Sequence, residues 1–123
     1  MSRILVVEDD DQLRTMLKLL LTSAGHDVTE ASDGAGVCDM HQRNPFDVII
    51  TDLVMPGIEG LGVITELRRR DPAVRIIAIS GAGQGRAEEY LKIAKKLGAQ
   101  VALSKPFSNE EFLKAVSSVL ERN

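Results

Sequence analysis

The chain has 123 residues, of which 44% are hydrophobic and 27% are charged, which is typical of one soluble globular domain. Its 15 basic and 18 acidic side chains give a net charge of −3, which argues against direct nucleic-acid binding, because such binding usually needs a basic surface. No apolar run approaches the ~20 residues that cross a bilayer, and no signal peptide is recognisable, so we expect a cytoplasmic protein without a membrane partner.

Short apolar runs rich in β-branched residues predict buried strands. The strongest lie at residues 4–7, 48–50 and 74–79, and weaker runs at 27–31 and 100–104 have the length of two further strands. The strong runs are continuous rather than alternating. This is typical of strands in a parallel sheet that helices cover on both faces.

Helical patterns fill the gaps between these runs. The first has apolar residues three or four positions apart: Leu13, Met16, Leu17, Leu20 and Leu21. A second apolar stripe covers 87–97, and less regular helices are expected over 33–43 and 58–70. Gly25 and Gly98 suit the positions just past two of these helix ends.

A last helix is predicted to begin after Ser108. Ser108 and Glu111 are spaced as a capping box, and Phe107 and Phe112 are spaced as the hydrophobic staple that often accompanies one. The chain then alternates strand and helix five times, which predicts an α/β fold with a parallel sheet and right-handed crossovers. We expect residues 1–123 to form one domain.

Polar side chains gather where four of the predicted strands end. They are Glu8, Asp9, Asp10 and Asp11 after the first strand, Asp52 after the third, Ser80 after the fourth and Lys105 after the fifth. The carboxyl ends of parallel strands meet at one edge of a sheet, where open α/β sheets bind their ligands. Each residue alone has a structural interpretation, because acids cap helices and Asp or Ser forms turns. Those separate interpretations do not explain why all of the residues suit one reaction.

That reaction is the transfer of a phosphoryl group to a carboxylate. Carboxylates from adjacent strands make an all-oxygen site of the kind that Mg²⁺ prefers, and an Asp beside the metal can act as a nucleophile. The transferred group needs its negative charge neutralised. An ammonium such as Lys105 and a hydroxyl such as Ser80 would supply the remaining contacts.

Four motifs carry a resemblance to a known family. Residues 4–10, 52–57 with Gly60, 80–81 and 105–107 are similar, in order and spacing, to the motifs of bacterial two-component response-regulator receiver domains. The resemblance implies a flavodoxin-like, doubly wound (βα)5 fold with a five-stranded parallel sheet in the order 2-1-3-4-5. It also implies phosphorelay signal transduction by a receiver without an output domain, which is no enzyme beyond its own phosphorylation and dephosphorylation.

The resemblance assigns a role to each acidic site residue. Asp52 would be the phosphoacceptor in a Mg²⁺-dependent reaction. Asp9 and Asp52 would bind Mg²⁺ directly, together with the backbone carbonyl of Val54, and Glu8 would bind it through water. The phosphodonor would be a phosphohistidine on a sensor histidine kinase or a histidine phosphotransfer protein. The downstream protein target is not specified by the sequence.

Two further residues would contact the phosphoryl group. Ser80 would hydrogen-bond one of its oxygens and move on activation. Lys105, joined by a cis bond to Pro106, would pair with its charge. Asp10 and Asp11 have no role in the family, and we interpret them as the cap and first turn of a helix.

One residue departs from the family pattern. The family often has Tyr or Phe three residues before the lysine, where this chain has Ala102. Without that ring, we expect the switch to depend on residues 81–90, which start beside Ser80 and end at the ring of Tyr90. Three glycines lower the rigidity of this segment: Gly81, Gly83 and Gly85.

Other interpretations are left open by the sequence. Residues 9–11 offer the Asp-x-Asp of a haloacid-dehalogenase-like phosphatase, although the later acids that such an enzyme needs fall on predicted helices. Residues 81–85 resemble a phosphate loop but lack the dinucleotide fingerprint, and the scarcity of aromatic residues disfavours a flavin site. The chain could also be a receiver fragment of a larger regulator. His26 and His41 are predicted to be isolated surface residues.

Overall fold

The structure is a computed structural model that describes residues 2–53, 59–81 and 87–121. The five strands are β1 (Arg3–Val7), β2 (Asp27–Ala31), β3 (Val48–Asp52), β4 (Ile76–Ser80) and β5 (Val101–Ser104). The helices are α1 (Asp11–Ser23), α2 (Val37–Arg43), α3 (Glu59–Arg70), α4 (Ala87–Leu97) and α5 (Asn109–Leu120). All strand pairs are parallel and the order is β2-β1-β3-β4-β5, so the predicted fold class and strand order are confirmed.

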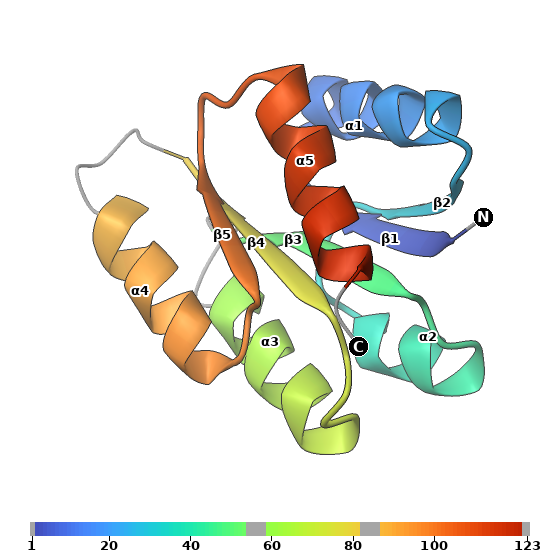
Figure 1. The fold of residues 1–123 in the computed structure, drawn as a ribbon. Coiled ribbons are helices and arrows are strands. Elements are labelled where there is room, and N and C mark those ends of the chain that lie inside the picture. The colour runs from blue at the N-terminus through green and yellow to red at the C-terminus, as the bar shows by residue number, and fades with distance from the viewer. Residues whose placement is uncertain (1, 54–58, 82–86, 122–123) are drawn as a thin grey trace.

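Helices cover both faces of the sheet, with α1 and α5 on one face and α2, α3 and α4 on the other (Figure 1). Successive residues of a strand point to opposite faces, so each central strand contributes to two cores. In β1, Ile4 and Val6 pack with α1 and α5, whereas Leu5 and Val7 pack with the other three helices. All four side chains are buried, which explains why this strand is apolar at every position.

Several helix ends lie where the sequence predicted them, and local capping interactions explain their positions. Gly25 and Gly98 have φ of 93° and 126°, in the left-handed region that favours glycine, and each follows a helix. At the start of α5, the Ser108 hydroxyl accepts from the N–H of Glu111 at 3.0 Å, and the Glu111 carboxylate accepts from the N–H of Ser108. Phe107 and Phe112 stack with their ring centroids 5.7 Å apart, so the capping box and its staple are confirmed.

Two elements start two or more residues later than predicted. Helix α2 begins at Val37 rather than at residue 33, because the Asp33 carboxylate accepts from the N–H of Ala35 at 2.9 Å and so favours a turn over a helix. Strand β4 begins at Ile76 rather than at residue 74. There the side-chain amide of Gln100 bonds to the N–H of Ile76 and the carbonyl of Val74, at 2.7 and 3.1 Å.

The prediction that His41 is an isolated surface residue is wrong. Its side chain on α2 is buried, with its Nδ1 accepting from the N–H of Phe46 at 3.1 Å. Since Nδ1 is an acceptor, the ring proton lies on Nε2, which donates to the Asp71 carboxylate at 2.8 Å. His41 therefore ties α2 to the end of α3. His26, the other histidine, is half-buried.

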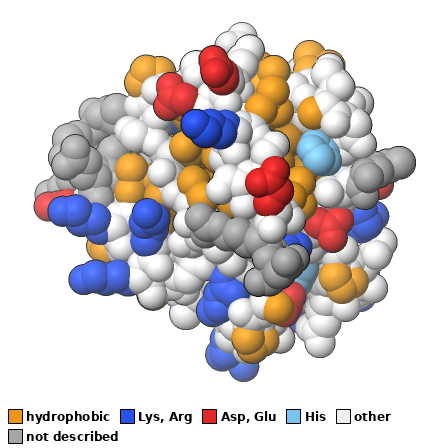
Figure 2. All heavy atoms as spheres, viewed as in Figure 1, with side chains coloured by type: hydrophobic (Ala, Val, Ile, Leu, Met, Phe, Trp, Pro, Cys, Tyr) orange, Lys and Arg blue, Asp and Glu red, His pale blue; other side chains and the backbone are white. Residues whose placement is uncertain are grey.

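The surface carries mixed charge. Blue Lys and Arg side chains gather over α4 in Figure 2, and this helix carries three exposed lysines, Lys92, Lys95 and Lys96. The large apolar side chains that lie exposed in the described ranges are Met16, Leu19 and Ile93. Over the same ranges, no helix combines the length and the apolar character needed to span a membrane.

Candidate functional site

Four strand ends bring polar side chains to one edge of the sheet. The register of β1 with β3 pairs Val7 with Thr51, so the next residue of each strand, Glu8 and Asp52, come side by side. Ser80 ends β4, and Lys105 follows β5 directly. The sequence-predicted residues of the strand ends thus meet because the strands are parallel and in register.

Three carboxylates form the centre of this site. Glu8, Asp9 and Asp52 each offer an oxygen, and the three oxygens lie within 4.8 Å of one another. Glu8 and Asp52 are buried, whereas Asp9 is exposed to solvent. An all-oxygen set of this number and spacing fits Mg²⁺, which takes one or two carboxylates and keeps several waters.

Lys105 neutralises part of this negative charge. Its Nζ donates to Glu8 Oε1 at 3.0 Å and to Asp52 Oδ2 at 2.9 Å. Burial alone would lower the pKa of Lys105, but its hydrogen bonds and charge interactions with Asp52 and Glu8 outweigh burial and raise that pKa. The ammonium therefore stays charged. The peptide bond that joins Lys105 to Pro106 is cis, as the family resemblance implied.

The surroundings of Glu8 do not fully compensate a charged carboxylate. Burial raises the pKa of Glu8 to about 7, and the hydrogen bond and negative charge of Asp52 add to this effect. The bond from Lys105 acts in the opposite direction but does not cancel the rise. A carboxylate that ligates a metal must be deprotonated, so a bound cation would favour the charged form of Glu8.

The Ser80 hydroxyl is a second polar group of the site that is not fully compensated. Its Oγ is buried and finds no hydrogen-bond partner in the described part of the chain. A buried hydroxyl without a partner costs about 1–3 kcal/mol, so such a group calls for an explanation. The backbone carbonyl of Ser80 accepts from the N–H of Lys105 at 2.8 Å, which joins the end of β4 to the residue that pairs with Glu8 and Asp52. Both observations fit a site built for Mg²⁺ and a phosphoryl group.

Gly60 lets α3 approach the end of β3. A Cβ at Gly60 would lie 2.6 Å from the carbonyl oxygen of Asp52 and 2.7 Å from the Cα of Leu53. Real side chains do not tolerate such contacts with backbone, so only glycine fits. Gly60 therefore helps to fix the backbone that carries Asp52.

The remaining acids of the 8–11 run lie outside the centre. The Asp10 carboxylate caps α1, accepting from the N–H groups of Gln12 and Leu13 at 3.0 and 3.2 Å. Asp11 is 83% exposed and binds Arg14. Both therefore have the cap and first-turn positions that the sequence predicted, and an Asp-x-Asp phosphatase pair of Asp9 and Asp11 is not favoured.

The structure describes only some of the remaining predicted residues. Val54, the predicted metal ligand, and Gly83 and Gly85 of the predicted switch lie outside the described residues. Gly81 is half-buried beside the Lys105 side chain, which a Cβ would meet at 3.9 Å. Ala102 is half-buried and packs against the core on the α2, α3 and α4 face.

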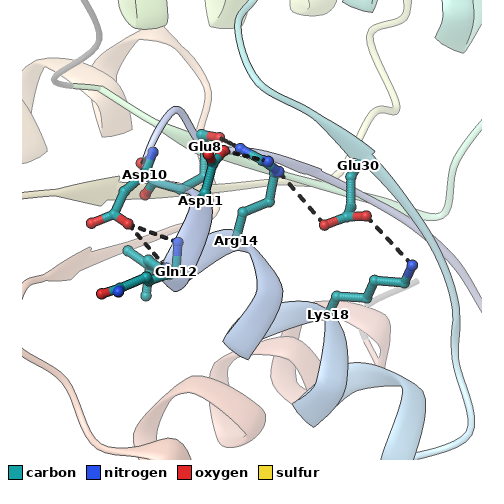
Figure 3. A network of polar contacts seen from close by, with 8 residues as sticks. Glu8, Asp10, Asp11, Gln12, Arg14, Lys18 and Glu30 are labelled. Carbon is teal, nitrogen blue, oxygen red and sulfur yellow. Dashed lines mark hydrogen bonds and ion pairs between the residues drawn. The ribbon is translucent and has the colours of Figure 1, made fainter.

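One residue at the site was missed by the sequence analysis. Arg14 of α1 donates from Nη1 to the backbone carbonyl of Glu8 at 2.8 Å (Figure 3). The only sequence signal was its position three residues after Asp11, which is the spacing of a helical ion pair and points to no site.

Comparisons with known proteins agree with this arrangement. Residues 4–117 match the family model described as Response regulator receiver domain. The chain is 32% identical to the chemotaxis protein CheY of Thermotoga maritima over 119 residues, which are 96% of this chain and 97% of that protein. It is 33% identical to the response regulator ArlR of Staphylococcus epidermidis over 123 residues, which cover 99% of this chain and 54% of that relative.

Solved structures show the same fold. The crystal structure of a response regulator receiver domain protein from Clostridium thermocellum matches with a TM-score of 0.89 at 27% identity, over 99% of this chain and 96% of that one. Receiver domains are signalling modules rather than classical enzymes, and they generally bind Mg²⁺ in an acidic pocket. They are phosphorylated by histidine kinases or phosphotransfer proteins and act on downstream targets. The chain belongs to the response-regulator receiver-domain family and works in two-component phosphorelay signalling.

Proposed function

We propose that Asp52 is the phosphoacceptor of this receiver and that Glu8, Asp9 and Asp52 hold a Mg²⁺ ion during the transfer. The observation that carries the proposal is a buried Asp52 carboxylate that lies against two further acids and is paired with Lys105 at 2.9 Å. Nearby, the buried Ser80 hydroxyl is without a partner among the described residues. A nucleophile, two acids, a cation and a spare hydrogen-bond donor are the groups that phosphoryl transfer to a carboxylate needs.

The step requires little covalent work from the protein. An oxygen of the Asp52 carboxylate forms a new P–O bond as the P–N bond of a phosphohistidine breaks, and the electron pair of that bond returns to the imidazole. Bound Mg²⁺ would supply charge neutralisation for the phosphoryl oxygens. Lys105 supplies a positive charge at the same place, and the Ser80 hydroxyl donates to a phosphoryl oxygen. The Val54 carbonyl, as a further metal ligand, rests on the family resemblance alone.

The donor and the target follow from the family. We propose a phosphohistidine of a sensor histidine kinase or of a histidine phosphotransfer protein as the donor. A downstream protein reads the phosphorylated form, with no direct contact to nucleic acid or membrane. The protein would act in the cytoplasm, and its self-catalysed reactions would be phosphorylation from a small phosphodonor and loss of the phosphoryl group.

Labelling with acetyl phosphate and Mg²⁺ tests the proposal. Wild type should gain one phosphoryl group by intact-mass measurement, Asp52→Asn should gain none, and EDTA should suppress labelling. Asp10→Asn is the matched control, because it removes a neighbouring negative charge while keeping a side chain that caps α1. Equal labelling of Asp52→Asn and wild type, or labelling in EDTA at the wild-type rate, would refute the assignment.

A further inference from the structure

Arg14 links the candidate site to two secondary-structure elements. Its Nη1 donates to the Glu8 carbonyl at 2.8 Å, and its Nη2 binds the Asp11 carboxylate at 2.6 Å. Its Nε lies 3.5 Å from Oε1 of Glu30 on β2. In Figure 3 the guanidinium lies between the turn that leads into α1 and the Glu30 side chain. The Arg14 side chain is only 17% exposed, so it is held between these partners rather than extended into solvent.

The carbonyl that Arg14 binds belongs to the peptide group between Glu8 and Asp9. These two residues carry two of the three carboxylates at the acidic centre. A peptide group is planar, so a bond to its oxygen restricts the backbone torsions on both sides. The directions of both side chains therefore depend on this contact. Among the residues that the structure describes, Arg14 is the side chain that bonds to this carbonyl.

The guanidinium geometry matters as much as its charge. A planar fork with several N–H donors can bond to the Glu8 carbonyl, Asp11 and Glu30 from one fixed position. A lysine ammonium would place the same charge there, but on a flexible stem without the fork. The neighbouring Lys18 also contacts Glu30, at 3.4 Å, but it makes no contact with the turn.

We propose that Arg14 is a positioning residue for the metal: it holds the Glu8–Asp9 peptide so that the carboxylates on both sides meet that of Asp52, and it thereby sets the affinity for Mg²⁺. The inference rests on the proposed Mg²⁺ site. Partners that orient metal ligands typically change metal affinity by ~10–100-fold when they are removed.

A purely electrostatic role would have the opposite sign. Arg14 brings a positive charge near the acidic centre, and a positive charge repels Mg²⁺. Loss of that charge alone would therefore tighten Mg²⁺ binding. Loss of the positioning contact would weaken it, so the direction of the change separates the two roles.

Mg²⁺ titration of the unphosphorylated protein, followed by the amide resonances of residues 8–12, tests the proposal. The variants are Arg14→Lys, which keeps the charge and loses the fork, and Arg14→Met, which loses both. We expect both to bind Mg²⁺ at least ~10-fold more weakly than wild type. Lys18→Met is the matched control, because it removes a positive charge from the same network without touching the turn. It should bind Mg²⁺ with wild-type affinity or slightly more tightly.

Each outcome decides the inference. Wild-type affinity in Arg14→Lys, or tighter binding in Arg14→Met, overturns the positioning role. Thermal melts in EDTA report whether the variants fold, and if Arg14→Met does not, Arg14→Lys alone decides. If the wild-type protein binds no Mg²⁺, the proposed function itself is refuted. If the wild type binds Mg²⁺ and Arg14→Lys binds it equally well, only the positioning role is refuted.

Discussion

Because α3 approaches β3 closely at Gly60, we expect the substitution Gly60→Ala to displace one of the two elements. The added Cβ would lie 2.6 Å from the carbonyl oxygen of Asp52 and 2.7 Å from the Cα of Leu53. Both are backbone atoms, so no flexible side chain can move aside to make room. Either the first turn of α3 or the end of β3 has to move, and the end of β3 carries Asp52, the proposed phosphoacceptor.

The size of the effect follows from these distances. Non-bonded carbon contacts are optimal at about 3.5 Å or more, so the two elements must separate by roughly 0.8 Å. Overpacking of this kind costs about 1–3 kcal/mol, and the better helix propensity of Ala offsets at most about 1 kcal/mol. We therefore expect Gly60→Ala to be about 1–2 kcal/mol less stable than wild type. A misplacement of about 1 Å at a reacting group can cost up to ~10²-fold in rate, so phosphorylation should also slow.

Gly62→Ala is the matched control on the same helix. A Cβ at Gly62 meets nothing within 4 Å, and the position is exposed. The variant should be more stable than wild type by about 0.5–1 kcal/mol and should be phosphorylated normally. Urea unfolding gives the stabilities, and acetyl phosphate labelling gives the rates. If Gly60→Ala proves as stable as Gly62→Ala, the tight contact between α3 and β3 is not present in solution.

Three further predictions address the rest of the molecule. Asp71→Asn should lower the free energy of unfolding by about 1 kcal/mol at neutral pH, because His41 donates to this carboxylate. That hydrogen bond lowers the pKa of Asp71 below its usual 3.8, so its contribution is present above pH 3.8 and is lost as the pH falls through the lower folded-state value. Urea unfolding should thus show wild type and variant converging only below that pH, and convergence at pH 5 would contradict the pairing. Lys105→Met should cost about 2 kcal/mol in EDTA, less than the ~3–5 kcal/mol of a fully buried pair, because Lys105 is 25% exposed. Mg²⁺ should raise the melting temperature of that variant more than that of wild type, and a wild-type melting temperature in EDTA would contradict the ion-pair role. A phosphoryl mimic at Asp52 should shift the amide resonances mainly from Ser80 to Leu91, with Ala102 changing much less, and the switch prediction is wrong if the largest distant shifts fall in α1 or α5.

The fold was predictable because its signals are local. A β-branched run that is buried on both faces specifies a central parallel strand, as residues 4–7 do for β1. The capping box at Ser108 and the left-handed Gly25 specify helix ends through bonds that span only a few residues. The start of α2 was missed because the Asp33 turn competes with the helix over the same few residues, and composition alone does not show which wins.

The site residues that could be predicted are those that lie at strand ends or in the family motifs. Parallel strands bring Glu8, Asp52 and Lys105 together, and the structure shows the contacts among them. The partners of His41 and Arg14 were not predictable, because Asp71 lies 30 residues from His41 and the Arg14 contact is with a backbone carbonyl. Every residue carries a backbone carbonyl, so the sequence does not show which of them a side chain will bind. Contacts of this kind have to be read from the structure.

In the proposed mechanism, the charges of the site would let Lys105 act in both the unphosphorylated and the phosphorylated protein. In the unphosphorylated protein its ammonium is shared between Glu8 and Asp52, whose buried carboxylates would otherwise repel each other. Phosphorylation would replace the Asp52 charge by an acyl phosphate of about −1.5 to −2, which is a stronger partner for the same ammonium. The N–H of Lys105 bonds to the carbonyl of Ser80, so the backbones at the ends of β5 and β4 are joined at this point. A change in the position of Lys105 would therefore be transmitted to the backbone of Ser80, whose hydroxyl has no partner among the described residues. Lys105, which compensates the acids, would thus also couple their charge to β4, the strand that precedes the proposed switch segment at residues 81–90.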